Sequence, residues 1–472
     1  MRDSNHGWLR RQFRFIRRQF LQDGELPFTD VLSESCVAEA LATIETRWND
    51  RIYSPLVTLW VFLSQVLSAD HSCRAAVARL VAHRASRGLS PCSARTGAYC
   101  QARQRLPERF FSTITRLVGR KLEEQTRPEW LWKGRHVYMF DGTTTLMADS
   151  AENQQAFSKT WNQKPGAALP LARLGAVFSL SCGAILDLEI ARYAGKGQGE
   201  ITLLRRLSHL FSAGTVLLAD AMVCDWRILF SFQQRGVDVV TRHNKARRKV
   251  DFRKGERLGK DDHLVEWPKP GMRMTDRELY KSMPKSMTVR EARVQIRQPG
   301  FRTRSMVIVT TLLDPREYSK EDLADLYRAR WNNELDLRSV KTVMQMDCLR
   351  CKTPELVRKE IWTHVLAYNL IRTVSAQAAS LYDVLPRSIS FKGTLQTIEA
   401  FQPMIALIGD RSRRTRLELY KELLHAVASH QVANSLDRIE PRRIKRRHKH
   451  YVPLSVPRQQ AKREILRGLA KN

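Results

Sequence analysis

The spacing of apolar residues divides the chain into a helical beginning and a strand-rich middle. Residues 1–130 carry apolar side chains mainly at the three- and four-residue intervals of helices. Two runs rich in β-branched and aromatic residues follow at 135–147 and 171–193. The second run is broken at Cys182-Gly183, as in a hairpin turn. The pattern therefore predicts a helical unit followed by a sheet.

Helical and strand patterns then alternate. Residues 199–214 form an amphipathic pattern that ends on a glycine, which predicts a helix. The next stretch, 214–220, is short and continuously apolar, is typical of a buried strand, and ends on Asp220. A second helix is predicted over 225–236 and a second strand over 237–242. These elements indicate an α/β core.

The composition changes abruptly at residues 244–303, which are charged, broken by glycine and proline, and contain only short strand-like fragments. We interpret them as a β-rich insertion. An apolar strand pattern returns at 305–313 and is followed by the start of a helix at 314–327. We therefore predict five segments: a helical N-terminal DNA-binding domain (1–130), the first part of the core (131–243), the insertion (244–303), the second part of the core (304–375) and a helical, basic C-terminal region (376–472).

Residues 72–106 are similar to a helix-turn-helix arrangement, in which Ser93 would cap the second helix. That helix would present a polar face to DNA, made of Arg95, Tyr99, Arg103 and Arg105. Two helices joined by a polar turn are also common in helical domains that do not bind DNA. The pattern therefore leaves both interpretations open.

Charge narrows the class of partner. The chain has 80 Lys and Arg against 48 Asp and Glu, a net charge of +32 and a pI near 10.3. Such an excess attracts nucleic acid, although an acidic protein or a membrane surface would use the same charge. The apolar run at 55–69 is too short to span a bilayer, and residues 1–20 lack the apolar stretch of an export signal. We expect a soluble, cytoplasmic protein without a membrane partner.

The eight cysteines are scattered and do not suggest a disulfide framework. Cys348 and Cys351 have CxxC spacing, but no second such pair accompanies them, so we expect buried thiols rather than a zinc site.

The segment 327–346 reads as a helix with an unusual charged stripe. Five residues share one face at offsets 0, 3, 7, 11 and 14, namely Tyr327, Arg330, Glu334, Arg338 and Lys341. Trp331 lies beside this face, and the opposite face is apolar. A solvated helix face, with Glu334 paired to Arg330 or Arg338, would have the same spacing.

Three carboxylates occupy positions that suggest chemistry. Asp141 lies inside an apolar strand pattern, Asp220 ends a buried one, and Glu334 lies on the charged stripe. A buried carboxylate is costly unless it pairs with a cation or binds a metal, and Mg²⁺ prefers such oxygen ligands. Alternatively, Asp141 starts an Asp-Gly turn, and Asp220 or Asp225 caps a helix.

At these residues the chain resembles the insertion-sequence-four family of DDE transposases. Tyr327, Arg330, Glu334 and Lys341 match the family's Y-(2)-R-(3)-E-(6)-K signature without a gap. The order of strands, helices and acids is also that of a ribonuclease-H-like sheet. Four surrounding segments resemble the family as well: QARQRL (101–106), LGKDDHLVEW (258–267), DLYRARWNNELDLRSVK (325–341) and LRCKTPELVRKEIW (349–362).

The resemblance implies a fold and an activity. It implies an α/β fold with a ribonuclease-H-like mixed sheet, interrupted by the β-rich insertion and flanked by helical regions. Asp141, Asp220 and Glu334 would be the catalytic acids and the ligands of Mg²⁺, for which Mn²⁺ could substitute. The enzyme would cut a mobile element out of double-stranded DNA at its terminal inverted repeats and join it to target DNA.

The resemblance also implies roles in DNA binding. Tyr327, Arg330 and Lys341 would grip phosphates and distorted terminal nucleotides, with help from Trp331 and Arg338. Acting on two ends at once implies a homodimer in a synaptic complex.

In the mechanism of such enzymes, water first releases a 3′-hydroxyl at the transposon end. The hydroxyl then forms a hairpin on the opposite strand, which is reopened before strand transfer. Relatives that flip a base carry a tryptophan wedge where this chain has Met306, and Trp267 is a substitute candidate. Two other functions remain open: a catalytically inactive DNA-binding repressor of transposition, and a nuclease that cuts without joining.

Overall fold

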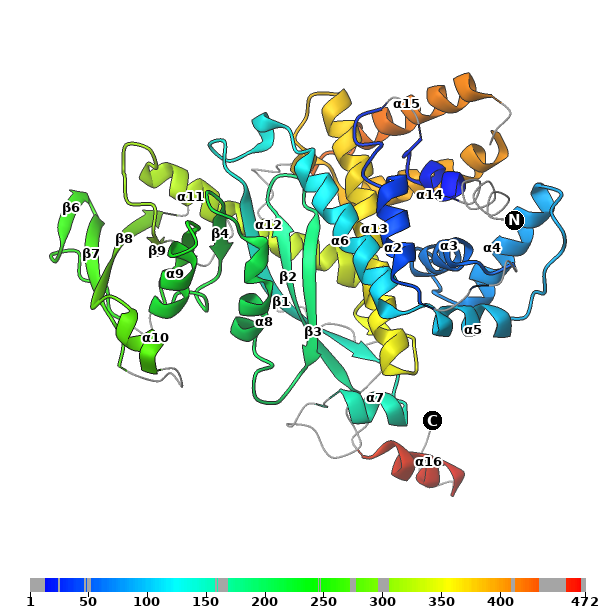
Figure 1. The fold of residues 1–472 in the computed structure, drawn as a ribbon, viewed down its shortest axis with the longest axis horizontal. Coiled ribbons are helices and arrows are strands. Elements are labelled where there is room, and N and C mark those ends of the chain that lie inside the picture. Colours follow the sequence, from blue (N-terminus) through cyan, green and yellow to red (C-terminus); the bar gives the residue numbers. More distant parts are fainter. Residues whose placement is uncertain are drawn as a thin grey trace.

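The computed structural model describes residues 13–23, 26–45, 48, 52–157, 159, 169–244, 246, 248–271, 277–295, 305–408, 412–432 and 456–467. A mixed sheet runs through the middle of the molecule, with helices from both ends of the chain gathered on one side of it (Figure 1). The strands β6–β8 of the insertion lie on the other side (Figure 1). Most of the basic tail, at 433–455 and 468–472, lies outside the described residues.

Five strands form the centre of the sheet, in the order β3-β2-β1-β4-β5. Strands β1, β2 and β3 are antiparallel neighbours, whereas β4 runs parallel to β1 and β5 parallel to β4. This is the ribonuclease-H-like arrangement that the sequence predicted. The bounds are β1 Val137–Met147, β2 Leu171–Ser179, β3 Ile185–Arg192, β4 Val216–Ala219 and β5 Asp238–Arg242.

The insertion extends this sheet instead of forming a separate one. Strand β9 pairs antiparallel with β5, and the ladder continues through β8 and β7 to β6. The short β10 pairs with the far end of β1. The bounds are β6 Glu256–Gly259, β7 Asp262–Pro268, β8 Ser286–Gln295, β9 Ser305–Thr310 and β10 Cys348–Leu349.

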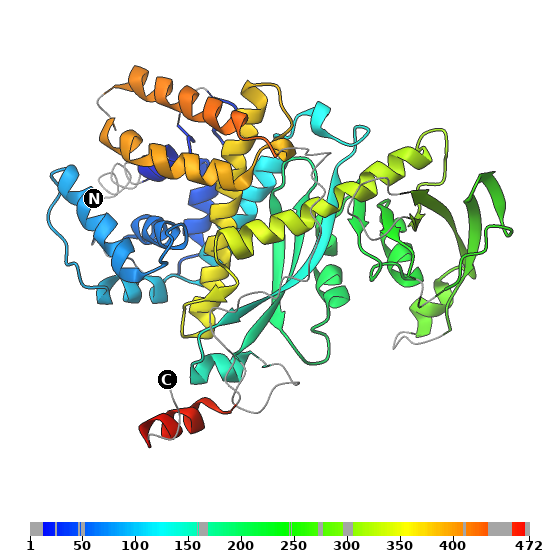
Figure 2. The same cartoon turned by 180° about the vertical axis from the view of Figure 1, so that it is seen from behind.

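Helices cover both faces of the central strands. Helix α8 (Glu200–Leu207) packs on β2 and β3 and lies in front of the sheet in Figure 1. Helices α11 (Lys320–Ala329) and α12 (Trp331–Arg338) cross behind it, as the reverse view shows (Figure 2). The remaining elements around the sheet are α7 (Ala151–Ala156), η2 (Ser208–Leu210), α9 (Trp226–Gln233), α10 (Arg277–Ser282) and η3 (Ser339–Val343).

The long helix α13 (Pro354–Leu381) joins the sheet to the terminal helices. It packs against α6, α3, α14 and α15, so residues from both ends of the chain share one core. The terminal elements are α2 (Glu34–Ala42), α3 (Pro55–Val66), α4 (Cys73–Ser86), α5 (Gly97–Arg105), α6 (Glu108–Glu124), η1 (Pro128–Trp130), η4 (Pro386–Ser388), α14 (Phe391–Ile408), α15 (Arg413–Ser429) and α16 (Arg458–Leu466). Within the described ranges, no helix has the length and apolarity needed to cross a membrane.

The structure contradicts the prediction that Ser93 caps the second helix of a helix-turn-helix and that this helix presents all four polar residues to DNA. Helix α5 begins at Gly97, so Ser93 does not cap it and instead accepts a hydrogen bond from the backbone N–H of Arg95 (3.2 Å). Tyr99 is fully buried and Arg103 is only 4% exposed, where its guanidinium lies 4.5 Å from the Tyr99 ring centroid. Two of the four residues expected to face DNA therefore belong to the core, because a stacked guanidinium can be buried among aromatic rings.

The β2–β3 turn depends on a glycine. Gly183 has a φ of 78°, and a Cβ at this position would overlap Arg387 Nη1 and lie 3.0 Å from Arg372 Nε. Gly134 has a similar φ of 73° but has nothing within 4 Å of the same point. Alanine substitutions at Gly134 and Gly183 therefore distinguish the cost of backbone strain from the cost of a steric clash.

We expect Gly134→Ala to lower the free energy of unfolding by about 1 kcal/mol, because alanine is strained at positive φ. Gly183→Ala should cost roughly 2 kcal/mol more, since the new methyl group displaces two arginines. Urea denaturation of both variants measures the difference. Equal losses would show that the turn tolerates the extra methyl group.

His364, in the middle of α13, links stability to pH. Its ring is fully buried, its Nδ1 lies 2.9 Å from the Glu360 carbonyl oxygen, and burial lowers its pKa to about 4. Between pH 6.5 and 4 the unfolded chain thus binds a proton that the folded chain does not. The free energy of unfolding should therefore decrease as the pH is lowered from 6.5 to 4, by up to about 1.4 kcal/mol per pH unit.

We expect His364→Gln to flatten this dependence, whereas His209→Gln, at a side chain that is 63% exposed, should leave it unchanged. Unfolding free energies at pH 7.5, 6.0 and 5.0 test the expectation. An unaltered slope in His364→Gln would assign the acid sensitivity to other groups.

Candidate active site

Asp141 and Asp220 lie at the same level on neighbouring strands. Met139 of β1 pairs with Leu218 of the parallel strand β4, so each aspartate stands two residues beyond this pair. Asp141 is also paired with Ala176 of β2 and is followed within the strand by Gly142. The Asp-Gly turn considered from the sequence is therefore not present.

The surroundings of Asp141 disfavour its charged form. Its Oδ1 accepts a hydrogen bond from the backbone N–H of Gly142 (2.8 Å). Burial nevertheless raises the pKa of Asp141 to about 6, and the negative charges of Asp220 and Glu200 act in the same direction while Arg330 opposes them. Such a carboxylate gains from a nearby cation.

Asp220 is held by its own loop and by the next strand. Its Oδ1 accepts a hydrogen bond from the backbone N–H of Met222 (2.9 Å), and its carbonyl oxygen accepts one from Thr241 Oγ1 (2.5 Å). The cap of α9 is Asp225, whose Oδ1 accepts from the backbone N–H of Arg227 (3.1 Å). Asp220 is therefore not the helix cap, and it stands directly after the end of β4.

The charged helix is not continuous, contrary to the sequence expectation. α11 begins with a Ser319–Asp322 capping box and ends at Ala329, and α12 starts again at Trp331 after the joint residue Arg330. From Ser339 the backbone continues as a π-helical turn. The wider turn changes the angular spacing, so Lys341 no longer follows the stripe that a regular helix would give.

The joint brings Arg330 and Glu334 together. Arg330 Nη2 lies 2.9 Å from Glu334 Oε1, the ion pair that the sequence left open as an alternative. The Arg330 guanidinium also lies 5.8 Å from the ring centroid of Tyr327, which is only 7% exposed. Glu334 itself remains 42% exposed. The structure thus brings Asp141 and Asp220 to the same level of the sheet and holds Glu334 beside Arg330.

The other predicted site residues differ in exposure. Trp331 is 39% exposed and Arg338 is exposed, whereas Lys341 is half-buried. Met306 is half-buried in β9, paired with Val294. Trp267 is buried, and its indole N–H donates to Glu291 Oε1 (2.8 Å). A buried, hydrogen-bonded indole is not presented to DNA, so Trp267 does not have the geometry of a wedge.

Glu200 was missed by the sequence analysis. It is the first residue of α8, and its carboxylate lies against Gly142 on β1. Burial raises its pKa, with Arg173 opposing and Asp220 adding to the rise. The only available signal was its position directly after the glycine-rich stretch 195–199, and nothing in that spacing points to a carboxylate site.

Helix α12 is anchored by a buried ion cluster that we call the Asp336 cluster, made of Asp336, Tyr368, Arg372 and Arg387. Asp336 is fully buried and lies 2.5 Å from Arg372 Nη2 and 2.8 Å from Arg387 Nη2. Its Oδ1 also accepts a hydrogen bond from the Tyr368 hydroxyl (2.9 Å). The same hydroxyl lies 2.9 Å from the Gly183 carbonyl oxygen, its second acceptor. The cluster therefore connects α12, α13, η4 and the β2–β3 turn.

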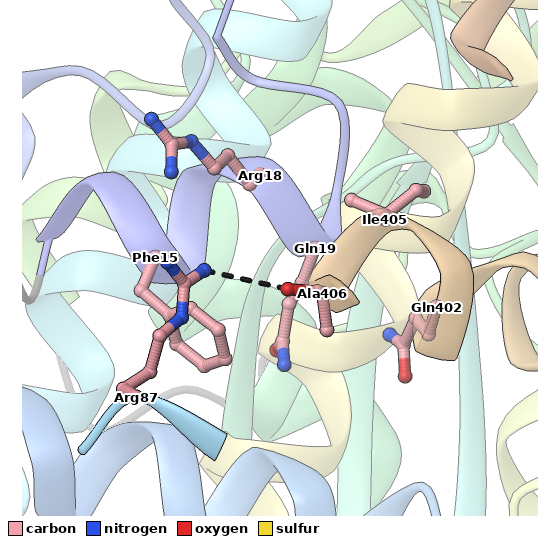
Figure 3. A pocket seen from close by; sticks show the side chains of 7 residues that line it. All are labelled: Phe15, Arg18, Gln19, Arg87, Gln402, Ile405 and Ala406. Carbon is pink, nitrogen blue, oxygen red and sulfur yellow. Dashed lines mark hydrogen bonds between the residues drawn. The ribbon is translucent and has the colours of Figure 1, made fainter. Parts of the chain in front are cut away.

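A small pocket elsewhere does not belong to this site. It lies among the terminal helices, where Arg87 Nη2 donates to the Ala406 carbonyl oxygen at 3.4 Å (Figure 3). Its lining comes from residues 13–19, Arg87 and α14, none of which carries a candidate catalytic acid.

The acids fit a divalent cation in chemistry and charge. Carboxylate oxygens are the donors that Mg²⁺ prefers. Burial is the main cause of the raised pKa of Asp141, and a nearby cation would favour its charged form. Within the ranges that the structure describes, no three His, Cys, Asp or Glu side chains are already arranged as a metal-holding group. Asp141, Asp220 and Glu334 are the carboxylates that would hold such an ion.

The strand order and the paired aspartates place the fold in the ribonuclease-H-like class. The family model described as the transposase DDE domain matches residues 132–370, half of the chain. Similarity to the IS4 transposase agrees with this match. The chain belongs to the DDE transposases of the IS4 family.

The similar proteins match this chain over different lengths. The transposase InsG of insertion sequence element IS4 from Escherichia coli K12 is 26% identical over 309 residues, which span 62% of this chain and 64% of InsG. The transposase of insertion sequence element IS421 from Escherichia coli is 43% identical over 65 residues, 14% of this chain and 18% of that protein. A cryo-EM structure of the piggyBac transposase synaptic complex with hairpin DNA aligns over 86% of this chain and 84% of its own, with a TM-score of 0.43 and 8% identity.

We expect Asp336→Asn to lower the free energy of unfolding by about 3–5 kcal/mol, because it leaves two buried arginines without their anion. Glu418→Gln is the matched control, since Glu418 pairs with Arg414 on an exposed helix face and should cost under about 0.5 kcal/mol. Chemical denaturation gives both values. A loss below about 1 kcal/mol in Asp336→Asn would mean that the cluster does not anchor α12.

Proposed function

We propose that this chain is a cut-and-paste DNA transposase that cleaves and rejoins DNA by divalent-metal-dependent phosphoryl transfer. The observation that carries the proposal is that Asp141 on β1 and Asp220, directly after the neighbouring strand β4, stand at the same level of the sheet. Helix α12, which bears Glu334, packs against β1. The excess of basic residues supports a polyanionic substrate.

Asp141, Asp220 and Glu334 are the proposed catalytic acids and metal ligands. Mg²⁺ is the proposed ion, with Mn²⁺ as a substitute. When bound, such ions activate an attacking oxygen and stabilise the leaving one. The buried Asp141 contributes a carboxylate whose charge becomes favourable once a cation is near.

Arg330 couples DNA binding to the position of Glu334. In the structure its guanidinium pairs with Glu334. A DNA phosphate is a competing bidentate partner for the same guanidinium. We propose that phosphate binding to Arg330 releases Glu334 toward Asp141, so that the acids assemble only when the substrate is present.

The remaining signature residues have different proposed roles. The buried ring of Tyr327 lies against the Arg330 guanidinium, and its proposed role is to hold that guanidinium in position. Arg338 and Lys341 contact phosphates, and the exposed Trp331 packs on distorted terminal nucleotides. Met306 remains the proposed wedge for a hairpin intermediate.

The proposed substrates are the element's terminal inverted repeats and target DNA, bound by a homodimer in a synaptic complex. We also propose that residues 1–130 contribute to DNA binding, that the C-terminal region contributes to the dimer, and that the enzyme acts at a bacterial nucleoid in the cytoplasm. No step of this scheme requires a membrane.

A second candidate is a catalytically inactive DNA-binding repressor of transposition. The observation that favours it is the Arg330–Glu334 ion pair, in which the third acid already has a cationic partner. The two functions make opposite predictions for DNA cleavage.

We expect the wild-type chain with Mg²⁺ to release a 3′-hydroxyl or a hairpin from labelled DNA that carries the element's own terminal repeat. Glu334→Gln should bind this DNA equally well but cut it at least about 100-fold more slowly, because a metal ligand is lost. Chelation by EDTA should abolish cutting. Gel analysis of cleavage, together with an assay for joined products, measures each step.

Glu321→Gln is the matched control, since Glu321 is exposed in the first turn of α11 and should leave cleavage unchanged. Wild-type binding without cleavage under any divalent metal would favour the repressor. Cleavage without joined products would instead define a nuclease.

A further inference from the structure

Three cysteine sulfurs surround one buried guanidinium among the N-terminal helices. Cys73 begins α4, Cys100 lies in α5, and Cys351 lies between β10 and α13. Helices α4 and α5 pack against each other beside α3 (Figure 1). Arg103 Nη2 lies 3.3 Å from Cys73 Sγ and 3.5 Å from Cys100 Sγ, and Arg103 Nη1 lies 3.9 Å from Cys351 Sγ. The fold therefore brings the sulfurs of Cys73 and Cys100 to one nitrogen atom.

The Arg103 guanidinium forms no ion pair with a carboxylate in the part of the chain that the structure describes. Its side chain is 4% exposed, and its other contacts are with Gln65 Oε1 (3.2 Å) and the Tyr99 ring. The buried carboxylate of Glu360 instead accepts a hydrogen bond from the backbone N–H of Cys351 (2.9 Å). Because a buried cation is costly without an anion beside it, these surroundings favour a thiolate as its partner.

Cys100 is the cysteine best placed to be that thiolate. Its hydrogen bond with Cys73, together with the charge of Arg103, lowers the pKa of Cys100 to about 5 against the opposing effect of burial. The same hydrogen bond raises the pKa of Cys73, and burial raises the pKa of Cys351. Cys73 and Cys100 are both half-buried, whereas Cys351 is buried. Cys100 thus combines thiolate character with access to solvent and has a second thiol next to it.

The CxxC pair does not have these properties. Cys348 is exposed and Cys351 is buried, and burial raises the pKa of both thiols. The thiolate is the form of cysteine that reacts with oxidants, so a pair of protonated thiols reacts slowly. The pair that the fold assembles from α4 and α5 is therefore better suited to oxidation than the pair with the suggestive spacing.

We propose that Cys73 and Cys100 form a reversible oxidation site for small hydroperoxides, in which Cys100 attacks the peroxide and Cys73 resolves the product. The Cys100 thiolate attacks the terminal peroxide oxygen, so an S–O bond forms while the O–O bond breaks. The leaving alkoxide, or hydroxide from hydrogen peroxide, takes up a proton from solvent. The Cys73 sulfur then attacks the Cys100 sulfenic acid, so an S–S bond forms while the S–O bond breaks. The departing hydroxide leaves as water with the Cys73 proton, and one peroxide has oxidised two thiols to a disulfide.

The disulfide would join α4 to α5 and remove the anion beside Arg103. The buried guanidinium would then keep the neutral oxygen of Gln65 but lose its thiolate partner. This loss disfavours the oxidised form, so a reductant should restore the thiols readily. In a reducing compartment the pair would be oxidised only transiently, as is typical of redox-sensing cysteines.

The test is peptide mapping by mass spectrometry of the full chain after brief treatment with equimolar hydrogen peroxide. We expect a Cys73–Cys100 disulfide in the wild-type chain, which dithiothreitol reverses. Cys73→Ser should instead leave a Cys100 sulfenic acid that dimedone captures, and Cys100→Ser should give neither product. Cys348→Ser is the matched control, because it removes an exposed thiol and should leave the yield of the disulfide unchanged.

Alkylation of the untreated wild-type chain by iodoacetamide tests the thiolate without any substitution. Between pH 6.5 and 8.5 the rate at Cys100 should change less than about 2-fold, whereas the rate at Cys348 should rise at least about 10-fold, because only Cys348 changes its thiolate fraction.

The outcomes are distinct. The mapped disulfide, the trapped sulfenic acid and a flat rate at Cys100 support the inference. No disulfide in the peroxide-treated wild-type chain, a disulfide between Cys348 and Cys351, or a rate at Cys100 that rises with pH as steeply as that at Cys348 overturns it. Each of these results leaves the proposed function intact, because none of these cysteines is among its catalytic acids.

Discussion

The position of α12 depends on the burial of one carboxylate, Asp336, between two arginines. A fully buried charge is stable only when its partners satisfy it, so Arg372 and Arg387 fix where α12 can lie. Tyr368 extends the same contacts to the carbonyl oxygen of Gly183 in the β2–β3 turn. The helix that carries Glu334 is thereby positioned against the same sheet that carries the two aspartates.

Local sequence patterns were sufficient for the elements of the core. The apolar runs around Asp141 and before Asp220 predicted β1 and β4, and the sheet order followed from the succession of elements. The spacing of Tyr327, Arg330 and Glu334 identified the helix region and the ion pair as one of two alternatives. These features depend on residues close together in sequence, which is the range over which periodicity is informative.

The features that the sequence did not reveal depend on long-range contacts or on backbone geometry. Asp336 is buried by arginines 36 and 51 residues away, so its spacing alone marks it as a surface residue. The joint at Arg330 and the π-helical turn change which residues share a face, although both segments look like regular helix. Glu200 reaches β1 only because Gly142 lacks a side chain, a contact between distant segments that periodicity does not report.

The hydrogen-bonded ladder from β5 through β9 makes the insertion mechanically continuous with the catalytic core. Thr241 of β5 is paired with Val309 of β9, and its hydroxyl group also holds the carbonyl oxygen of Asp220. The outer strands and the loop that carries Asp220 are therefore joined through one hydrogen-bonded sheet. The insertion is a continuation of the core sheet rather than a separately tethered unit.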